Sequence, residues 1–167
     1  AMTELAKYID VCISNEEDAK DVFGIEAEAT DIYGGQLNHE GYKSVAKQLA
    51  DKFGFEKVAI TLRESHSAFD NGWSAMLYDG ENYCFSKKYD LHIIDRVGGG
   101  DSFGGGLIYS LLSGKDTQAA VEFAVAASAL KHSSSSSRGF AGFFCSNNSR
   151  LTSRNDVNET SASKQHN

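Results

Sequence analysis

The sequence predicts an α/β fold, in which a parallel sheet carries helices on its faces and an antiparallel meander is appended to it. An amphipathic helical pattern over 39–53 is followed by a short loop and a strand-like run at 57–62, which is typical of a parallel sheet with crossover helices. Strand-like runs separated by Gly-containing turns between residues 68 and 89 indicate the meander. A β-branched run at 92–94 then leads through a glycine-rich turn into an apolar helix.

Composition limits the class of protein. A chain of 167 residues with 41% hydrophobic residues can bury one core. The net charge of −7 and the lack of a basic stripe argue against a surface for nucleic acid or an anionic membrane. No apolar run has the roughly 20 residues that span a bilayer. Three scattered cysteines and the lack of a signal-peptide pattern indicate a cytoplasmic protein with reduced thiols.

The first predicted elements are a strand and a capped helix. The apolar and β-branched run Tyr8–Ile13 predicts a buried strand. A helix over Glu16–Phe23 follows, with Asn15 or Ser14 as its N-cap and Gly24 at its end. Acidic residues in its first turn suit the helix dipole, so this stretch read alone is a well-capped surface helix.

A second helix and strand follow a stretch of weak periodicity. Ala27–Gln36 is predicted to be a loop or an irregular helix. Asn38 caps an amphipathic helix over His39–Phe53, which Gly54 ends. Lys57–Leu62 follows as a strand.

The middle of the chain predicts the antiparallel meander, ending near Tyr89. Two turn signals, Asn71-Gly72 and Asp79-Gly80, separate its strands. The strand-like runs are Ala68-Phe69, Trp73–Tyr78 and Tyr83–Phe85.

Two helices and a tail complete the chain. The helices are predicted at about Asp101–Ser113 and at Thr117–His132. At Ser133 the composition changes abruptly, and residues 133–167 contain ten serines and five asparagines. Such a segment cannot bury enough apolar surface to offset its ordering entropy. We therefore expect a folded domain over 1–132 and a disordered or aberrant tail over 133–167.

The glycine-rich turn is the strongest chemical signal. Gly98, Gly99 and Gly100 connect the strand-like run to a helix whose first turn holds Asp101. Unpaired N–H groups at a helix N-terminus, together with the helix dipole, favour a bound anion. The turn lacks the lysine of a P-loop, and its glycine spacing does not fit the dinucleotide-binding fingerprint.

An ionised aspartate beside such an anion site suits phosphoryl transfer. Asp101 could accept a proton from an attacking hydroxyl, which is worth about 10²–10⁴-fold in rate. The amides of Gly98–Gly100 could stabilise charge on the phosphoryl oxygens, at roughly 3 kcal/mol for one such donor. The structural alternative is a tight strand-to-helix turn in which Asp101 only caps the helix.

Residues 95–106, Asp-Arg-Val-Gly-Gly-Gly-Asp-Ser-Phe-Gly-Gly-Gly, resemble the D-x-x-G-A/G-G-D-x-F-x-x-G signature of ribokinase-like (PfkB-type) carbohydrate kinases, and most of all that of 2-keto-3-deoxygluconate kinases. The resemblance implies part of a three-layer, Rossmann-like fold and ATP-dependent phosphorylation of a sugar or sugar acid. It makes Asp101 the catalytic base and Gly98, Gly99 and Gly100 the hole for the γ-phosphate. It implies Asp95 at the edge of the substrate or of the phosphate. Arg96 is implied toward a sugar-acid carboxylate, with a plain surface charge as the open alternative.

Two other stretches resemble motifs of the same family. Asn15-Glu16-Glu17-Asp18 is similar to Asn-x-x-Glu, which organises Mg²⁺ and phosphate through water, and this implies Asn15 and Asp18 at the metal. Residues 61–66 stand in the place of the nucleotide loop Thr-x-Gly-x-x-Gly. There Thr61 matches, whereas Arg63 and His66 replace the glycines, so Thr61 and Arg63 are implied near ATP.

The resemblance covers residues 3–132, about half of a kinase of this family. It implies that most sugar contacts lie outside the chain, and that the chain is a C-terminal piece with an out-of-frame or unrelated tail, poorly active alone. A non-catalytic nucleotide- or anion-binding fragment, and a fructokinase-type or other sugar kinase, stay open as alternatives. The resemblance also leaves a homo-oligomer open for the intact family member.

Overall fold

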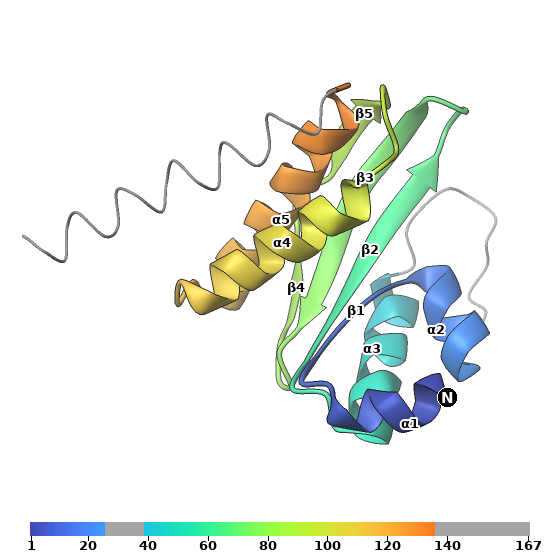
Figure 1. Ribbon diagram of the computed structural model, residues 1–167, viewed down its shortest axis with the longest axis vertical. Helices are drawn as coiled ribbons and strands as arrows, with labels where there is room; N and C mark the ends of the chain where they lie inside the picture. Colours follow the sequence, from blue (N-terminus) through green and yellow to red (C-terminus); the bar gives the residue numbers. More distant parts are fainter. Residues whose placement is uncertain (26–38, 136–167) are drawn as a thin grey trace, which may run out of the picture.

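A five-stranded mixed sheet forms the centre of the protein, whose structure is a computed structural model that describes residues 1–25 and 39–135 (Figure 1). The strand order is β1-β2-β3-β4, and β5 also pairs with β3. β1 and β2 are parallel, and the other pairs are antiparallel. The strands are β1 (Val11–Asn15), β2 (Lys57–Ser65), β3 (Asp70–Tyr78), β4 (Tyr83–Phe85) and β5 (Tyr89–His92).

Helices cover both faces of the sheet, as the α/β prediction requires. α3 packs on one face, and α4 and α5 pack on the other (Figure 1). The helices are α1 (Met2–Leu5), a short 3₁₀ helix (Ala6–Tyr8), α2 (Glu16–Phe23), α3 (His39–Phe53), α4 (Gly99–Leu112) and α5 (Thr117–His132). In the described part of the chain, no helix is long and apolar enough to cross a membrane.

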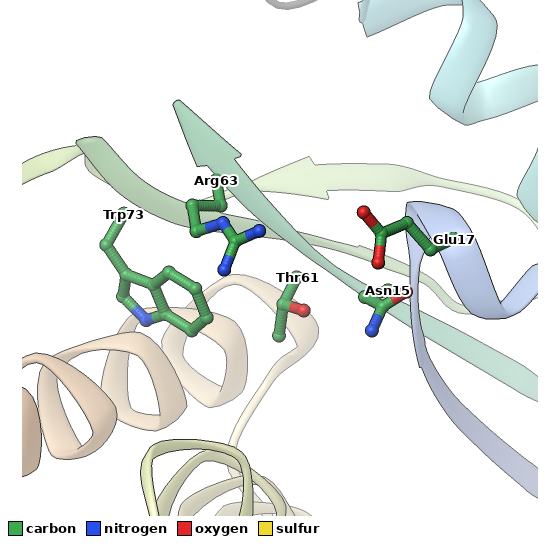
Figure 2. Close-up of a pocket in the computed structure, with 5 residues that line it drawn as sticks. All are labelled: Asn15, Glu17, Thr61, Arg63 and Trp73. Carbon is green, nitrogen blue, oxygen red and sulfur yellow. The ribbon is translucent and has the colours of Figure 1, made fainter. Parts of the chain in front are cut away.

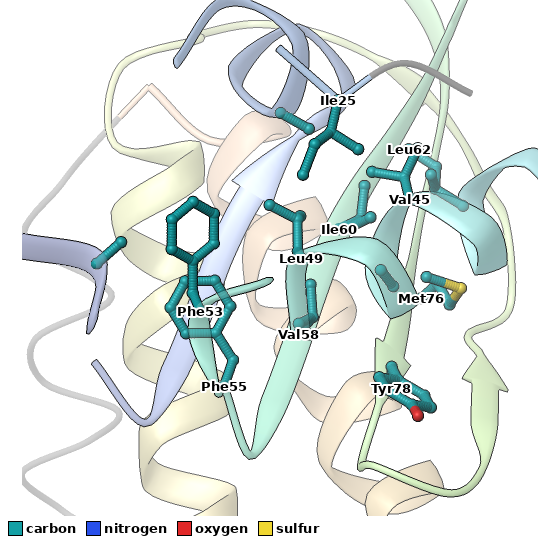
Figure 3. Close-up of a cluster of buried hydrophobic side chains, with 13 residues drawn as sticks. Ile25, Val45, Leu49, Phe53, Phe55, Val58, Ile60, Leu62, Met76 and Tyr78 are labelled. Atoms are coloured by element: carbon teal, nitrogen blue, oxygen red, sulfur yellow. The ribbon is translucent and has the colours of Figure 1, made fainter. Parts of the chain in front are cut away.

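The alternation of side chains along β2 separates two hydrophobic cores. Val58, Ile60 and Leu62 face α3 and join the cluster drawn in Figure 3. Ala59 points to the opposite face and packs with the residues of α4 and α5. Because successive strand residues alternate between faces, Thr61 lies on the α4/α5 face as well.

Small residues let α4 and α5 approach each other closely. A Cβ on Gly106 of α4 would lie 3.1 Å from the backbone Cα of Ala124 in α5. Ala120 and Ala124 are fully buried at this contact. The backbone proximity explains why this part of α4 carries glycine although glycine disfavours helix interiors.

Most predicted helices are confirmed with their boundaries. α2, α3 and α5 coincide with the predicted ranges, and Gly24 and Gly54 follow α2 and α3 in positive-φ conformations. α4 begins at Gly99, two residues before the predicted start, because Gly98 is the left-handed residue from which the helix starts. The predicted Asn38 cap, the prediction for Ala27–Gln36 and most of the predicted tail lie outside the described residues.

The predicted turn at Asn71-Gly72 is wrong. Both residues lie inside β3 and pair with β2 and β5. The Asn71 side chain is 1% exposed and its Oδ1 accepts a hydrogen bond from Ser65 Oγ at 3.2 Å, so a typical turn residue is used as a buried strand residue. The reversal comes earlier, where Ser67 Oγ accepts hydrogen bonds from the Phe69 and Asp70 N–H groups.

Two predicted strand ranges are displaced. The first strand begins at Val11 rather than Tyr8 and continues to Asn15, because residues 6–8 form a 3₁₀ turn. β5 ends at His92, so the predicted 92–94 strand contributes only its first residue. Ile93 and Ile94 continue from β5 toward the glycine turn, and their N–H groups donate to Phe69 O and His132 O.

Candidate active site

A pocket of about 130 Å³ opens at the carboxyl end of β1, beside the second half of β2. Crevices at the carboxyl ends of parallel strands are the usual ligand sites of α/β sheets. Asn15 of β1 and Thr61 of β2 face each other directly in the parallel register. The lining residues, drawn in Figure 2, are Asn15, Glu17, Thr61, Arg63 and Trp73.

The structure separates the two residues that were predicted to organise a metal. Asn15 lines the pocket, but Asp18 does not. Asn15 Oδ1 accepts from the Asp18 N–H at 2.7 Å, and Asp18 Oδ2 accepts from the Asn15 N–H at 3.1 Å. This reciprocal pair is a capping box, which satisfies two backbone donors at the start of α2. The Asp18 carboxylate therefore serves the helix end.

Glu17 is the carboxylate that lines the pocket, and the motif spacing did not point to it. Figure 2 shows its side chain entering from α2 beside Asn15. In a capping box, the third residue of the helix, here Asp18, bonds back to the N-cap residue. This pattern could have assigned Asp18 to the cap and left Glu17 as the candidate ligand.

Arg63 and Trp73 form the other wall of the pocket. They are directly opposed in the antiparallel register of β2 and β3. Figure 2 shows the Arg63 guanidinium between the indole of Trp73 and the rest of the pocket. The structure thus brings Thr61 and Arg63, the two candidate nucleotide residues, into one pocket. Trp73 was not predicted to lie there. It is two residues before Ala75, a core residue of the same face.

The glycine turn lies on the same face of the sheet as the pocket. Gly98 has φ 81°, and the Ser102 N–H donates to Gly98 O at 2.9 Å. The N–H groups of Gly100 and Asp101 in the first turn of α4 have no carbonyl within the helix to bond. The Asp101 side chain is exposed.

Packing of α4 against β1 relates the turn to the pocket. A Cβ on Gly104 would lie 3.8 Å from Ile13 Cδ1. Asp101 precedes Gly104 by about one helical turn, and Asn15 follows Ile13 by two strand residues. The start of α4 and the carboxyl end of β1 therefore lie on the same face of the sheet.

Asp95 and Arg96 are already engaged by the protein. Asp95 Oδ2 accepts a hydrogen bond from Lys131 Nζ at 2.9 Å, and Asp95 Oδ1 accepts one from the Val97 N–H. The Lys131 bond, followed by the Val97 N–H, lowers the pKa of the Asp95 carboxyl. The exposed Arg96 guanidinium donates to the carbonyl of Ala68 in the β2–β3 turn. Neither residue lines the pocket.

The pocket residues fit a magnesium–phosphate complex better than a protein-enclosed metal. Among residues 1–25 and 39–135, no group of three or more His, Cys, Asp or Glu could hold a metal ion. Mg²⁺ commonly takes one or two carboxylates and completes its shell with water and substrate phosphates. The Glu17 carboxylate and the Asn15 amide oxygen are donors of this kind.

Comparison with known proteins identifies the family that this arrangement matches. The sequence profile of the pfkB family of carbohydrate kinases matches residues 1–140. The structure is similar to that of 2-dehydro-3-deoxygluconokinase from Thermotoga maritima, with 47% identity, a TM-score of 0.74, and coverage of 81% of this chain and 39% of that one. A PfkB family carbohydrate kinase from Listeria grayi is 28% identical, with a TM-score of 0.67 over 85% of this chain and 43% of that one.

A third relative matches by sequence. It is a 2-dehydro-3-deoxygalactonokinase from Haloferax volcanii, 24% identical over 131 residues, which are 78% of this chain and 35% of that protein. The chain thus spans well under half the length of the relatives it matches. The likeness in three dimensions confirms the predicted partial ribokinase-like fold.

Proposed function

The chain belongs to the pfkB family of carbohydrate kinases, and from this premise we propose that it takes part in ATP-dependent phosphorylation of a sugar-acid hydroxyl, with 2-keto-3-deoxygluconate as the substrate. One observation carries the proposal: the amide-rich start of α4, with Asp101, lies on the same face of the sheet as the polar pocket at the carboxyl end of β1, beside β2. The substrate named for the Thermotoga maritima relative supports the choice of sugar acid.

Asp101 is the proposed catalytic base. Its carboxylate accepts the proton of the sugar hydroxyl while that oxygen attacks the γ-phosphorus, and the bond to the leaving ADP oxygen breaks. Proton acceptance of this kind contributes about 10²–10⁴-fold to a rate. The amides of Gly98, Gly99 and Gly100 and the positive end of α4 stabilise the charge on the transferred phosphoryl oxygens.

The pocket is proposed to receive the phosphates and metal of the nucleotide. Arg63 supplies positive charge, and Thr61 supplies a hydroxyl on the neighbouring wall. Asn15 and Glu17, rather than Asn15 and Asp18, are the proposed partners of Mg²⁺, through oxygen atoms and water. Held by these residues, Mg²⁺ would supply positive charge against the charge that develops on the phosphoryl group.

The two candidate substrate residues receive different roles. Arg96 is exposed next to the glycine turn, and its guanidinium carries N–H groups beyond the one that donates to Ala68 O. It therefore keeps the proposed role toward the sugar-acid carboxylate. Asp95 is proposed to stabilise the segment that leads into the glycine turn and not to bind the substrate, because its two oxygens already accept hydrogen bonds from Lys131 and from the Val97 N–H.

Titration of the chain with ATP, with and without Mg²⁺ and 2-keto-3-deoxygluconate, tests the proposal. We expect nucleotide binding that strengthens with Mg²⁺, and slow ADP formation that depends on the sugar acid. Nucleotide binding without any sugar-dependent ADP formation would favour the non-catalytic nucleotide-binding fragment. Absence of nucleotide binding would contradict both functions. A panel of fructose and other sugars tests the remaining alternative, a kinase of the same family with another substrate.

A further inference from the structure

We propose that Ser128, Lys131 and His132, in the last turns of α5, are positioning residues that hold the glycine turn in the geometry that binds a phosphoryl group. This inference rests on the proposed function of that turn. We call these three residues the α5 platform. All three are buried, with exposed fractions of 0%, 4% and 6%, although serine, lysine and histidine are polar. Buried polar side chains are costly unless they have partners, so their contacts indicate their purpose.

Ser128 bonds directly to the start of α4. Its hydroxyl donates to Gly99 O at 2.8 Å, and both groups are buried. The bond fixes the plane of the peptide that joins Gly99 to Gly100, and therefore the direction of the Gly100 N–H on the other end of that peptide. Ser128 thus orients one of the amides that are proposed to bind the anion.

His132 supports the turn through its ring and its backbone. A Cβ on Gly99 would lie 2.3 Å from His132 Cε1, so the imidazole occupies the space that any other residue at position 99 would need. The His132 carbonyl accepts from the Ile94 and Asp95 N–H groups at 2.9 and 3.3 Å. The ring also packs edge-on against Trp73, at 5.0 Å between centroids, and Trp73 lines the pocket. His132 therefore contacts both the turn and a wall of the pocket.

Lys131 holds the segment that leads into the turn. Its Nζ donates to Asp95 Oδ2 at 2.9 Å, while the other Asp95 oxygen accepts from the Val97 N–H. Its Cε would lie 3.5 Å from a Cβ on Gly98, the residue with φ 81°. Three side chains of α5 thus contact residues 95–99: Lys131 through an ion pair, Ser128 through a hydrogen bond and His132 through its ring. A loop held at several points loses less conformational entropy when its amides bind an anion.

The test compares Ser128→Ala with a matched serine at the same helix end. Ser133 is the control, since its hydroxyl donates to Ala129 O at 3.0 Å within α5 and does not contact the turn. Amide resonances of Gly98–Asp101 are followed by ¹⁵N NMR during titration with MgATP, and thermal unfolding is measured in parallel. We expect Ser128→Ala to shift the Gly98–Gly100 resonances before ligand is added and to weaken MgATP binding about five- to tenfold. Ser133→Ala should leave both unchanged.

A second pair of variants extends the test to the ion pair. Lys131→Met should weaken MgATP binding more than Ser128→Ala does, and Lys115→Met, at an exposed position in the α4–α5 connection, should not. Equal MgATP affinity of the wild-type chain and a folded Ser128→Ala variant would overturn the α5 platform while leaving the proposed function intact. Failure of the wild-type chain to bind MgATP would overturn the proposed function, and the platform with it.

Discussion

At the scale of single residues, the pocket assigns different tasks to two adjacent carboxylates. Asp18 caps α2 through its bond with the Asn15 N–H, and Glu17 lines the pocket. The sequence motif predicted Asp18 at the metal because it matches the family's fourth position. The three-residue spacing between Asn15 and Asp18 is also the spacing of a capping box, so the same pattern arises where a helix starts.

Separate substitution of Asp18 and Glu17 distinguishes a helix cap from a metal ligand. Asp18→Ala should lower the free energy of unfolding by about 1 kcal/mol through loss of the cap, and leave the Mg²⁺ dependence of ATP binding unchanged. Glu17→Gln should weaken the Mg²⁺ dependence and leave stability within about 0.5 kcal/mol. Urea denaturation and calorimetric titration measure the two effects. The assignment is wrong if Asp18→Ala, while folded, abolishes the Mg²⁺ effect and Glu17→Gln does not.

We expect His132 to make the stability of the protein sensitive to mild acid. Burial lowers the pKa of its imidazole; the nearby Lys131 and Arg96 charges act in the same direction, while the Asp95 carbonyl and carboxylate oppose them. Since the folded-state pKa lies below the unfolded value of about 6.5, the unfolded state binds more protons, and stability falls as pH decreases through that value.

Denaturation midpoints between pH 8 and 5 measure this effect. We expect a flat region above pH 7 and a decline below about pH 6.5, part of which should disappear in His132→Gln. A further decline in stability is expected at lower pH, because hydrogen bonds in the folded state lower the pKa values of the Asp70, Asp79 and Asp95 carboxyls. The unfolded state therefore takes up protons at these groups first. If the denaturation midpoint of a folded His132→Gln variant falls with pH between 7 and 5.5 as steeply as that of the wild type, His132 does not cause the acid sensitivity.

At the scale of elements, the close packing of α4 on α5 depends on one glycine more than on its neighbour. A Cβ on Gly106 would lie 3.1 Å from the Ala124 Cα, whereas a Cβ on Gly105 would have nothing within 4 Å. Gly106→Ala should therefore destabilise the protein by about 1–3 kcal/mol through overpacking. Gly105→Ala should stabilise it by up to about 1 kcal/mol, because alanine is the better helix former. Urea denaturation compares the two; equal effects would show that the helix contact is looser than observed.

Elements with strong local signals could be predicted from the sequence, and elements fixed by distant contacts could not. α2 and α3 have an apolar stripe and a glycine at the end, so their limits follow from local chemistry. Asn71-Gly72 has the local chemistry of a turn, but β2 and β5 pair on both sides of it and bury it in β3. Pairing with a strand some twenty residues away is not visible in a two-residue motif.

At the scale of the whole molecule, the candidate site draws on segments that are far apart in the sequence. β1 and α2 provide Asn15 and Glu17 to the pocket, and β2 provides Thr61 and Arg63. The first turn of α4 is the proposed source of the amides and of Asp101. The position of the glycine turn at the start of a helix could be predicted because its residues are contiguous. Trp73 and the α5 platform could not, because their roles arise from tertiary contacts with the turn and the pocket.

The central claim is that Asp101 is the base of a phosphoryl-transfer site. The most direct measurement is the rate of 2-keto-3-deoxygluconate phosphorylation by a chimera, in which residues 1–132 replace the matching part of the Thermotoga maritima kinase that is 47% identical to this chain. Asp101→Asn in this chimera should lower kcat by about 10²–10⁴-fold, with MgATP affinity nearly unchanged, while Asp90→Asn at an exposed position of β5 should have no effect. A kcat for Asp101→Asn within a factor of a few of the parent chimera would contradict the claim.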